Sequence, residues 1–561
     1  MMQVKKRDSV VQSDVLVIGG GIGGMQAAIT AADQGASVVV AEKADTRRSG
    51  SGATGNDHFM CYIPSYHGDD FDAIIAEVTD TLVGPLQDLD LLRLMMKRSF
   101  EVVQKWESYG INMRPFSDNY EFYGHAMPGR RRYHLKYDGK MQKPLLTKED
   151  KKRGVQIVNK TVINELLTDG KGRVTGAIGI CTAEDEPEVI VFQAKAVIIA
   201  TGNASRMYPS TNPAYLFNQA DCPATTGSGH AMAYRAGARL VNIDMPYLHA
   251  GPKYFARCGK ATWIGVLVDY YGRPVGPFVN KPTKELGDAT SDIWQGVFQE
   301  KMEDGSGPVF MNCSENDPED MEFMMHAFES EGDTSIVDYL NQYHIDLNKE
   351  MIEFGTYDYA LCGRGLDIQL TGQTSLDGLY ACGDVLGNVR GDITSAAVFG
   401  MISAENAAAY AKTVDFEDVA EHPLIEQSIT LYNDILGRKN GAHWKEANSM
   451  LQQIMKDYVG VKVRSKTLMK SGLKYLGDLK RYCREQFKAE NAHELMRSLE
   501  VLDLIDLAEA IAITSENRKE SRGAYHHRTD YTYTNPLLDN KFQTIEQHDG
   551  KVVLNFRDKT R

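Results

Sequence analysis

The sequence predicts an α/β protein in which a parallel-sheet domain is interrupted by an inserted α+β lobe and followed by a helical domain. Three observations lead to this fold class. Residues 14–42 have the pattern of a strand, a glycine-rich turn, a helix and a second strand; short apolar runs return at 194–202 and 378–384; and the pattern is helical from about 412 to 518. Because buried strands and helices alternate early in the chain, a parallel sheet covered by helices is expected.

The pattern of residues 14–42 predicts a Rossmann-like dinucleotide-binding domain. Gly19, Gly21 and Gly24 follow the strand DVLVIG and open the helix. In this context the glycines permit a tight turn, a close approach of the backbone to a diphosphate, and close helix–sheet packing, while the helix N-terminus attracts the phosphates. Glu42 ends the second strand, where it can accept hydrogen bonds from ribose hydroxyls, which favours FAD or NAD over NADP.

Two later strands distinguish FAD from NAD. Ala200, Thr201 and Gly202 end the strand AKAVIIATG, and Asp384 ends the much later strand GLYACGD. An NAD domain does not need such a late strand, whereas Asp384 can bind the ribitol hydroxyls of the extended FAD. We therefore expect FAD as the cofactor.

The remaining patterns complete the domain organisation. Residues 154–180 predict short strands around the turn at Asp169 and Gly170, and the tail FQTIEQHDGKVVLNF predicts a terminal hairpin. Residues 221–354 are richer in Gly, Pro, aromatic and acidic residues and have irregular periodicity. The expected segments are an FAD-binding domain at 1–220 and 355–412, a capping (substrate) domain at 221–354, a helical domain at 413–535, and a tail at 536–561.

Composition excludes several other classes of protein. The chain has 561 residues, a formal net charge of -14 and 42% hydrophobic residues, which is ordinary for a globular protein and argues against a general nucleic-acid binder. No run is long and apolar enough for a membrane helix, and no apolar segment follows the basic N-terminus as in a signal peptide. The eight cysteines are scattered without a C-x-x-C motif, so we expect no metal site and reduced thiols in a cytoplasmic protein.

Several motifs resemble one family of flavoproteins: the flavoprotein subunits of succinate dehydrogenase, fumarate reductase, L-aspartate oxidase and adenylylsulfate reductase. The resemblance covers nearly the whole chain, and several segments look most similar to the adenylylsulfate reductase alpha subunit. The segments that carry it are Glu42-Lys43, Arg48-Ser49-Gly50, Lys143-Pro144-Leu145-Leu146, the ATG strand, Thr226-Gly227-Ser228-Gly229-His230, the GLYACGD strand, His493-Glu494-Leu495-Met496-Arg497, Arg518-Lys519-Glu520-Ser521-Arg522-Gly523-Ala524 and Arg528-Thr529-Asp530-Tyr531.

The resemblance implies how the flavin is held. It places Lys43, Ser49, Gly50 and Ser395 among the cofactor-binding residues. In the membrane-complex succinate dehydrogenases and fumarate reductases, a histidine at the position of Gly50 bonds covalently to the flavin. Glycine has no imidazole, so the FAD is expected to be non-covalent and of lower reduction potential, which suits reduction chemistry better than succinate oxidation.

The resemblance also implies a substrate site between the flavin and the inserted lobe. His249 and Arg390 match substrate-binding residues of the family, and a guanidinium can hold a carboxylate or phosphate through two hydrogen bonds. Two family segments are missing, however: the one with the proton-donating arginine, expected between Trp263 and Tyr270, and a histidine-bearing one that residues 360–365 replace. The candidate substrate contacts are His58, His249, Arg257, Arg364 and Arg390, with a structural role as the alternative for each.

Two enzymatic functions remain open at this point. The first is the catalytic flavoprotein subunit of an oxidoreductase resembling adenylylsulfate reductase or fumarate reductase, which acts on a small anionic substrate and exchanges electrons with an iron–sulfur partner. The second is a stand-alone flavin reductase or dehydrogenase of an activated C–C bond. A non-catalytic FAD-binding scaffold is disfavoured by the complete FAD motif set. The substrate, the direction of the reaction and the oligomeric state are not indicated by the sequence.

One charge asymmetry points to a partner. Residues 438–488 contain thirteen Lys and Arg but four Asp and Glu, in a chain of net charge -14. A solvated helical face is one explanation. The alternative is a docking surface for an acidic, ferredoxin-like subunit, since a basic patch would steer and orient such a partner.

Overall fold

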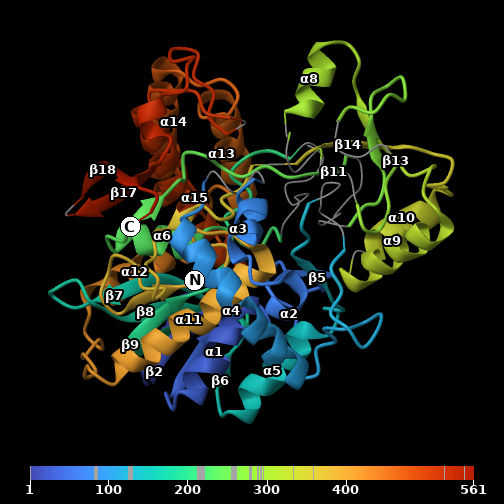
Figure 1. The fold of residues 1–561 in the computed structure, drawn as a ribbon. Coiled ribbons are helices and arrows are strands. Elements are labelled where there is room, and N and C mark those ends of the chain that lie inside the picture. The colour runs from blue at the N-terminus through green and yellow to red at the C-terminus, as the bar shows by residue number, and fades with distance from the viewer. Residues whose placement is uncertain are drawn as a thin grey trace.

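The computed structural model describes residues 2–80, 86–123, 130–210, 222–253, 262–276, 281–286, 290, 294, 296–332, 334–357, 359–523, 525–548 and 550–560. Its α/β architecture confirms the predicted fold class. A large sheet with helices α1 and α11 against it forms one part of the molecule, the lobe with α8, α9 and α10 projects from one side, and helices α13 and α14 rise beside it (Figure 1).

An eight-stranded sheet forms the centre of the molecule. Its strands follow the order β6-β3-β2-β9-β8-β7, and β1 and β16 also pair with β9. The predicted strands of residues 14–42, 194–202 and 378–384 lie together here as β2, β3, β9 and β16, all in parallel pairs. Most of their residues are buried, as expected for parallel strands covered on both faces. The strands are β1 (Lys5–Lys6), β2 (Val11–Ile18), β3 (Val38–Ala41), β6 (Gln156–Val158), β7 (Thr161–Thr168), β8 (Val174–Cys181), β9 (Glu188–Ile199) and β16 (Leu379–Ala381).

Helices α1 and α11 pack closely against each other beside this sheet (Figure 1). Both are rich in small residues, and glycines lie at the contact: a Cβ at Gly400 would be 2.5 Å from the carbonyl oxygen of Gly23. Neighbouring elements complete this part of the chain. They are α1 (Ile22–Asp33), β4 (His58–Met60), α2 (Pro64–His67), α3 (Phe71–Thr79), α4 (Leu89–Ser108), β5 (His134–Lys136), α5 (Gln142–Lys152), α6 (Ser228–Arg235) and α11 (Asp392–Ala411).

The inserted lobe has a hydrophobic core of its own. Its four-stranded antiparallel sheet has the order β11-β14-β13-β12, and Met324, Phe328 and Phe354 are among the residues buried beneath it. Its elements are β11 (Ala250–Pro252), β12 (Val266–Val268), α8 (Val297–Glu303), β13 (Val309–Asn312), α9 (Pro318–Ser330), α10 (Thr334–Gln342) and β14 (Ile352–Thr356).

The C-terminal part is helical, as predicted, and ends in the expected antiparallel hairpin. That hairpin extends a sheet of order β15-β10-β17-β18, so it is tied to strands from much earlier in the chain. The elements are β10 (Leu240–Val241), β15 (Gly365–Leu366), α12 (Pro423–Gly437), α13 (Trp444–Tyr458), α14 (Lys466–Gln486), α15 (Ala492–Asn517), the 3-10 helix η2 (Pro536–Leu538), β17 (Lys541–His548) and β18 (Lys551–Asp558). None of the helices in the described ranges is long and apolar enough to cross a membrane.

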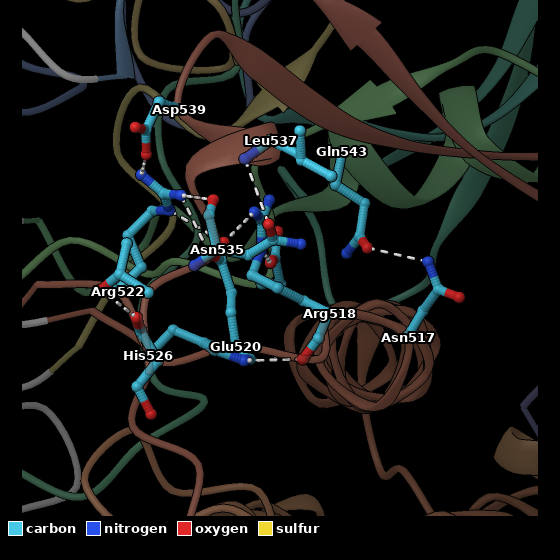
Figure 2. A network of polar contacts seen from close by, with 12 residues as sticks. Asn517, Arg518, Glu520, Arg522, His526, Asn535, Leu537, Asp539 and Gln543 are labelled. Atoms are coloured by element: carbon cyan, nitrogen blue, oxygen red, sulfur yellow. Dashed lines mark hydrogen bonds and ion pairs between the residues drawn. The ribbon is translucent and has the colours of Figure 1, made fainter. Parts of the chain in front are cut away.

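A network of charges joins the end of α15 to the hairpin (Figure 2). Glu520 accepts hydrogen bonds from Arg518 at 2.9 Å and from Arg522 at 2.8 and 2.9 Å, and Arg522 also donates to Asp539 at 2.9 Å. Because Glu520 is fully buried, its two arginine partners are needed to offset the loss of hydration. This network fixes the segment between α15 and β17.

Candidate functional site

The glycine turn after β2 leaves an open approach to the N-terminus of α1. Gly19 has φ +99° and a Cβ there would be 2.5 Å from the carbonyl oxygen of Ala200, while a Cβ at Gly24 would be 1.9 Å from that of Gly19. A Cβ at Gly21 would meet only Ala200, at 4.0 Å, so this glycine faces open space. Gly21 is also the N-cap of α1 and provides no side-chain cap. The backbone N–H groups of the first turn are therefore available to an anion, as a diphosphate requires.

Buried side chains hold this turn from behind. Glu42 accepts hydrogen bonds from the backbone N–H groups of Gly20 and Ala44, each at 2.6 Å. The hydroxyl of Ser49 donates to the carbonyl oxygen of Gly20 at 3.2 Å, and the ammonium of Lys143 donates to the same oxygen. Glu42 keeps further lone pairs, so its predicted bonds to ribose hydroxyls stay compatible with this arrangement.

Unpaired polar atoms line the strand ends beside the turn. Thr201 Oγ1, Asn203 Nδ2 and Thr394 Oγ1 are buried and have no hydrogen-bond partner among the described residues. Since buried polar groups are normally hydrogen-bonded, these atoms indicate a site for a ligand rich in hydroxyl and carbonyl groups. Together with the open turn at Gly21, they fit the predicted FAD.

The other predicted cofactor residues occupy different positions around the turn. Gly50 has φ +81°, and a Cβ there would be 3.4 Å from Gly21 Cα. Ser395 lies in the first turn of α11 and its hydroxyl donates to the carbonyl oxygen of Asp392 at 3.0 Å. Gly202 has φ +76°, a left-handed conformation that glycine adopts without strain.

Lys43 points toward the helical region. Its ammonium lies 2.9 Å from Glu500 on α15, which also pairs with Arg206 at 3.0 Å and Arg497 at 2.9 Å. Burial alone would raise the pKa of Glu500, but these cations lower it. Lys43 therefore links the end of β3 to α15, and the geometry gives no support for a direct bond from its ammonium to the cofactor.

Arg390 and His249 meet through one aromatic residue that the sequence reasoning missed. The guanidinium of Arg390 lies over the ring of Tyr247 at 3.6 Å from its centroid, and the hydroxyl of Tyr247 lies 3.0 Å from Nδ1 of His249. Arg390 is 5% exposed and donates to Asp392 from Nε at 3.2 Å and Nη2 at 2.9 Å. Burial opposes the charge of Arg390, but Asp392 raises its pKa well above the usual value. Arg390 is therefore a positioned, charged group with Nη1 unpaired among the described residues.

Arg364 adds a second buried guanidinium to this cluster. It is 1% exposed and donates from Nε to the carbonyl oxygen of Met245 at 2.8 Å and from Nη1 to that of Gly363 at 2.9 Å. Burial and the nearby charge of Arg390 lower the pKa of Arg364 to about 10. Gly363 has φ +65°, and a Cβ there would be 2.8 Å from Cβ of Arg390, so the two arginine-bearing segments are in direct contact.

Asp384 borders the same cluster. Its carboxylate, the carboxylate of Asp392 and the thiol of Cys362 offer atoms that all lie within 4.8 Å of one another. Asp384 lies just after the end of β16, and Asp392 is the first residue of α11. The predicted flavin strand therefore ends, and this helix begins, at the arginine cluster. The structure thus brings together Asp384, His249, Arg364 and Arg390, four residues predicted from the sequence.

His58, another predicted substrate contact, lies in a different group of charged side chains. His58 lies at the start of β4, where its Nδ1 is 2.5 Å from Asp57, a buried carboxylate that also pairs with Lys136 at 2.5 Å. The hydroxyl of Thr262 donates to this same Asp57 at 2.9 Å, so the surroundings of His58 link the sheet domain to the inserted lobe. Arg257 lies outside the described residues.

Three contributors to the site were not predicted. The sequence patterns predict no role for Tyr247 or Asp392, and Lys143 belongs only to a segment that carries the family resemblance. The sequence does carry a signal for Asp392, since an acid two residues after Arg390 is well placed to pair with it. Tyr247 and Lys143 depend on contacts between distant segments and have no local signature.

Comparison with known proteins identifies the family of the chain. A family described as an FAD binding domain matches residues 14–394, and one described as the fumarate reductase flavoprotein C-terminus matches residues 448–558. One of the subunits of fumarate reductase (CoM/CoB) from Methanothermobacter marburgensis is 25% identical over 566 residues, covering 94% of this chain and 95% of that one. L-aspartate oxidase from Yersinia pestis is 25% identical, covering 92% and 96%. The structure of adenylylsulfate reductase from Archaeoglobus fulgidus superposes with a TM-score of 0.85 at 22% identity, covering 100% and 97%.

Proposed function

The chain belongs to the FAD-binding domain family and is an FAD-dependent oxidoreductase with a fumarate reductase flavoprotein C-terminal domain. We propose that it is a catalytic flavoprotein subunit that acts on a small anionic substrate. The observation that carries the proposal is the pair of buried guanidiniums, Arg364 and Arg390, beside the strand and helix that end at the cofactor site. Bound FAD supplies the two-electron chemistry.

In this proposal Arg390 is the principal substrate anchor. Its Nη1 is unpaired among the described residues, and Tyr247 and Asp392 fix the plane of its guanidinium. A guanidinium held in this way can bind a carboxylate or phosphate oxygen without first losing much side-chain freedom. Among the described residues, Nη1 makes no hydrogen bond that the anion would have to replace.

His249 and Tyr247 would orient the substrate and handle a proton. The Nδ1 of His249 is hydrogen-bonded to the Tyr247 hydroxyl at 3.0 Å, which sets the orientation of an imidazole that can exchange a proton near neutral pH. Arg364 contributes a second positive charge, from Nη2, which has no partner among the described residues. The named relatives act on fumarate, on L-aspartate or on adenylylsulfate, all of which are anionic, and a dianionic or phosphorylated compound suits two guanidiniums.

We propose that the FAD is held without a covalent bond and that electrons are exchanged with a separate iron–sulfur subunit. Gly50 has no side chain to bond the flavin. The described cysteines are all free thiols, and neither group of potential metal ligands among the described residues contains more than one of them. A cysteine-rich partner would supply the electron relay. A stand-alone flavin reductase or dehydrogenase of an activated C–C bond is the second candidate, and isolation without any brown, cysteine-rich subunit would favour it.

The proposal is tested by reoxidation of the reduced protein. The dithionite-reduced holoprotein is mixed under anaerobic conditions with fumarate, adenylylsulfate and other small anions, and flavin absorbance is followed. We expect one anion to reoxidise the flavin quickly, and Arg390→Lys to weaken its binding by roughly 1.5–3 kcal/mol, because lysine keeps the charge but loses the two-point geometry. Wild-type kinetics in the lysine variant, with unchanged FAD content, would remove Arg390 from the substrate site.

A further inference from the structure

A buried lysine lies directly behind the glycine turn. Lys143, in the first turn of α5, is fully buried, and its ammonium donates to the carbonyl oxygen of Gly20. Gly20 precedes Gly21, whose open face marks the approach to the N-terminus of α1. The lysine therefore brings a positive charge from a separate helix to the turn that faces the diphosphate.

The ammonium of Lys143 forms no ion pair with a carboxylate among the described residues. An ammonium has three N–H donors, and the single described acceptor is a peptide carbonyl. Asp150, on the same helix, is also fully buried, but neither of its carboxyl oxygens has a hydrogen-bond partner among the described residues, and burial raises its pKa well above the usual value. No hydrogen bond or ion pair therefore joins Asp150 to the ammonium of Lys143.

The surroundings oppose the charge of this lysine. Burial lowers the pKa of Lys143 to about 8, although the carboxyl groups of Glu42, Asp150 and Asp45 act in the other direction. Glu42 is itself engaged by the N–H groups of Gly20 and Ala44. An ammonium buried without a paired anion is costly, so its retention at this position requires a use for the charge.

We propose that Lys143 is a cofactor-binding residue whose ammonium stabilises the diphosphate of FAD from behind the glycine turn. It acts together with the N-terminus of α1, where the unpaired N–H groups bind the phosphate oxygens directly. The isoalloxazine and the substrate are not part of this inference, which depends only on the FAD site. The two negative charges of the diphosphate would in turn keep Lys143 protonated when the cofactor is bound.

The test measures affinity for FAD, for ADP-ribose, which carries the adenosine and diphosphate without the flavin, and for adenosine, which has no phosphate. FAD release from the holoprotein is followed by flavin fluorescence, and the other two are measured by their competition with FAD. We expect Lys143→Met and Lys143→Gln to weaken FAD and ADP-ribose by roughly 10- to 100-fold and adenosine by less than about 3-fold, as for loss of a charged hydrogen bond. Lys148→Met, at an exposed position of the same helix, should change none of these.

The glutamine variant separates this proposal from a structural role. Glutamine can still donate to the Gly20 carbonyl but carries no charge, so wild-type affinities in Lys143→Gln would show that the lysine only holds the turn. Equal weakening of adenosine and ADP-ribose in either variant would overturn the proposal in the same way. Wild-type protein provides an independent measurement: ADP-ribose binding should weaken as pH rises above the pKa of Lys143 while adenosine binding stays level, and a level profile for both contradicts the charge.

Discussion

Gly50 decides whether the flavin can be bonded to the protein. Its backbone has φ +81° and lies next to Gly21, and the family resemblance places the flavin-linking histidine of the membrane complexes at this position. We expect acid or heat denaturation to release all of the flavin into the supernatant. Flavin fluorescence that remains on the denatured protein band in a gel would contradict this expectation.

His230 makes stability depend on pH near the active site. It is fully buried, its Nε2 lies 3.1 Å from the carbonyl oxygen of Arg364, and burial lowers its pKa to about 4. The unfolded chain binds this proton near pH 6.5, so it takes up more protons than the folded chain between pH 6.5 and 4, and the free energy of unfolding falls as pH falls through that window.

Replacing His230 should therefore remove part of the acid sensitivity. Between pH 7 and pH 5 the wild-type chain should lose roughly 2 kcal/mol of unfolding free energy that His230→Gln does not lose. Denaturant unfolding at the two pH values measures this difference, with FAD content matched between the proteins. Parallel losses in both proteins would mean that the pKa of His230 is not lowered in the folded chain.

Some residues of the candidate site could be predicted from the sequence, whereas their contacts could not. Arg390, Asp384 and the glycines could be predicted because each follows a strand with a recognisable ending. The contacts of Arg390 with Tyr247 and of Lys143 with Gly20 could not be predicted, because they join segments with no shared periodicity. His58 was chosen for its chemistry alone, and its position beside Asp57 depends on the pairing of β4 with β5.

At the scale of elements, the contact between α1 and α11 depends on the absence of side chains. A Cβ at Gly400 would be 2.5 Å from the carbonyl oxygen of Gly23, and a Cβ at Gly23 would be 3.0 Å from that of Ala396. We expect Gly400→Ala to separate the two helices and to cost roughly 1–3 kcal/mol of unfolding free energy, with faster loss of FAD because both helices begin at the cofactor site.

Gly477, on α14, provides the matched control. No atom lies within 4 Å of a Cβ added there. Gly477→Ala should leave FAD retention unchanged and raise stability by about 0.5–1 kcal/mol, because alanine has the higher helix propensity. Thermal unfolding and flavin fluorescence compare the two variants, and equal effects would show that the α1–α11 contact tolerates a methyl group.

The strands and helices that could be predicted from the sequence are those whose segments have a single, clear hydrophobic pattern. The β-branched runs of β2, β3, β9 and β16 were predicted because most of their residues are buried. The helices after residue 412 were predicted because their apolar residues recur on one buried face. The inserted lobe was recognised as separate, but its sheet was not predicted, since its strands are short and lie among turns. Of the thirteen bases of residues 438–488, Arg464 is fully buried and does not contribute to a charged surface.

At the scale of the whole molecule, α14 presents the basic surface proposed for an iron–sulfur partner. Lys466, Lys470 and Lys474 are exposed and recur every fourth residue, so they share one face of the helix. Tyr475 and Tyr482 are 43% and 39% exposed on the same helix, and aromatic side chains of this kind are common at protein interfaces.

Charge reversal tests this surface. Replacing Lys466, Lys470 and Lys474 together with glutamate should slow electron transfer to or from an acidic ferredoxin and weaken the salt dependence of the rate, while FAD content stays intact. Reversal of Lys148, an exposed lysine on α5, is the control. Normal transfer rates at low ionic strength in the triple variant would identify α14 as a solvated surface without a docking role.

The sheet β15-β10-β17-β18 has a consequence for the time at which the enzyme becomes complete. β15 follows Arg364 immediately, pairs with β10, and β10 pairs with β17, which begins at Lys541. During synthesis the glycine turn after β2 leaves the ribosome long before β17 does. The strand pair β10–β15, which lies next to Arg364, therefore keeps one edge of β10 unpaired until β17 has been synthesised, and a nascent chain exposes that edge to other strands for most of its synthesis.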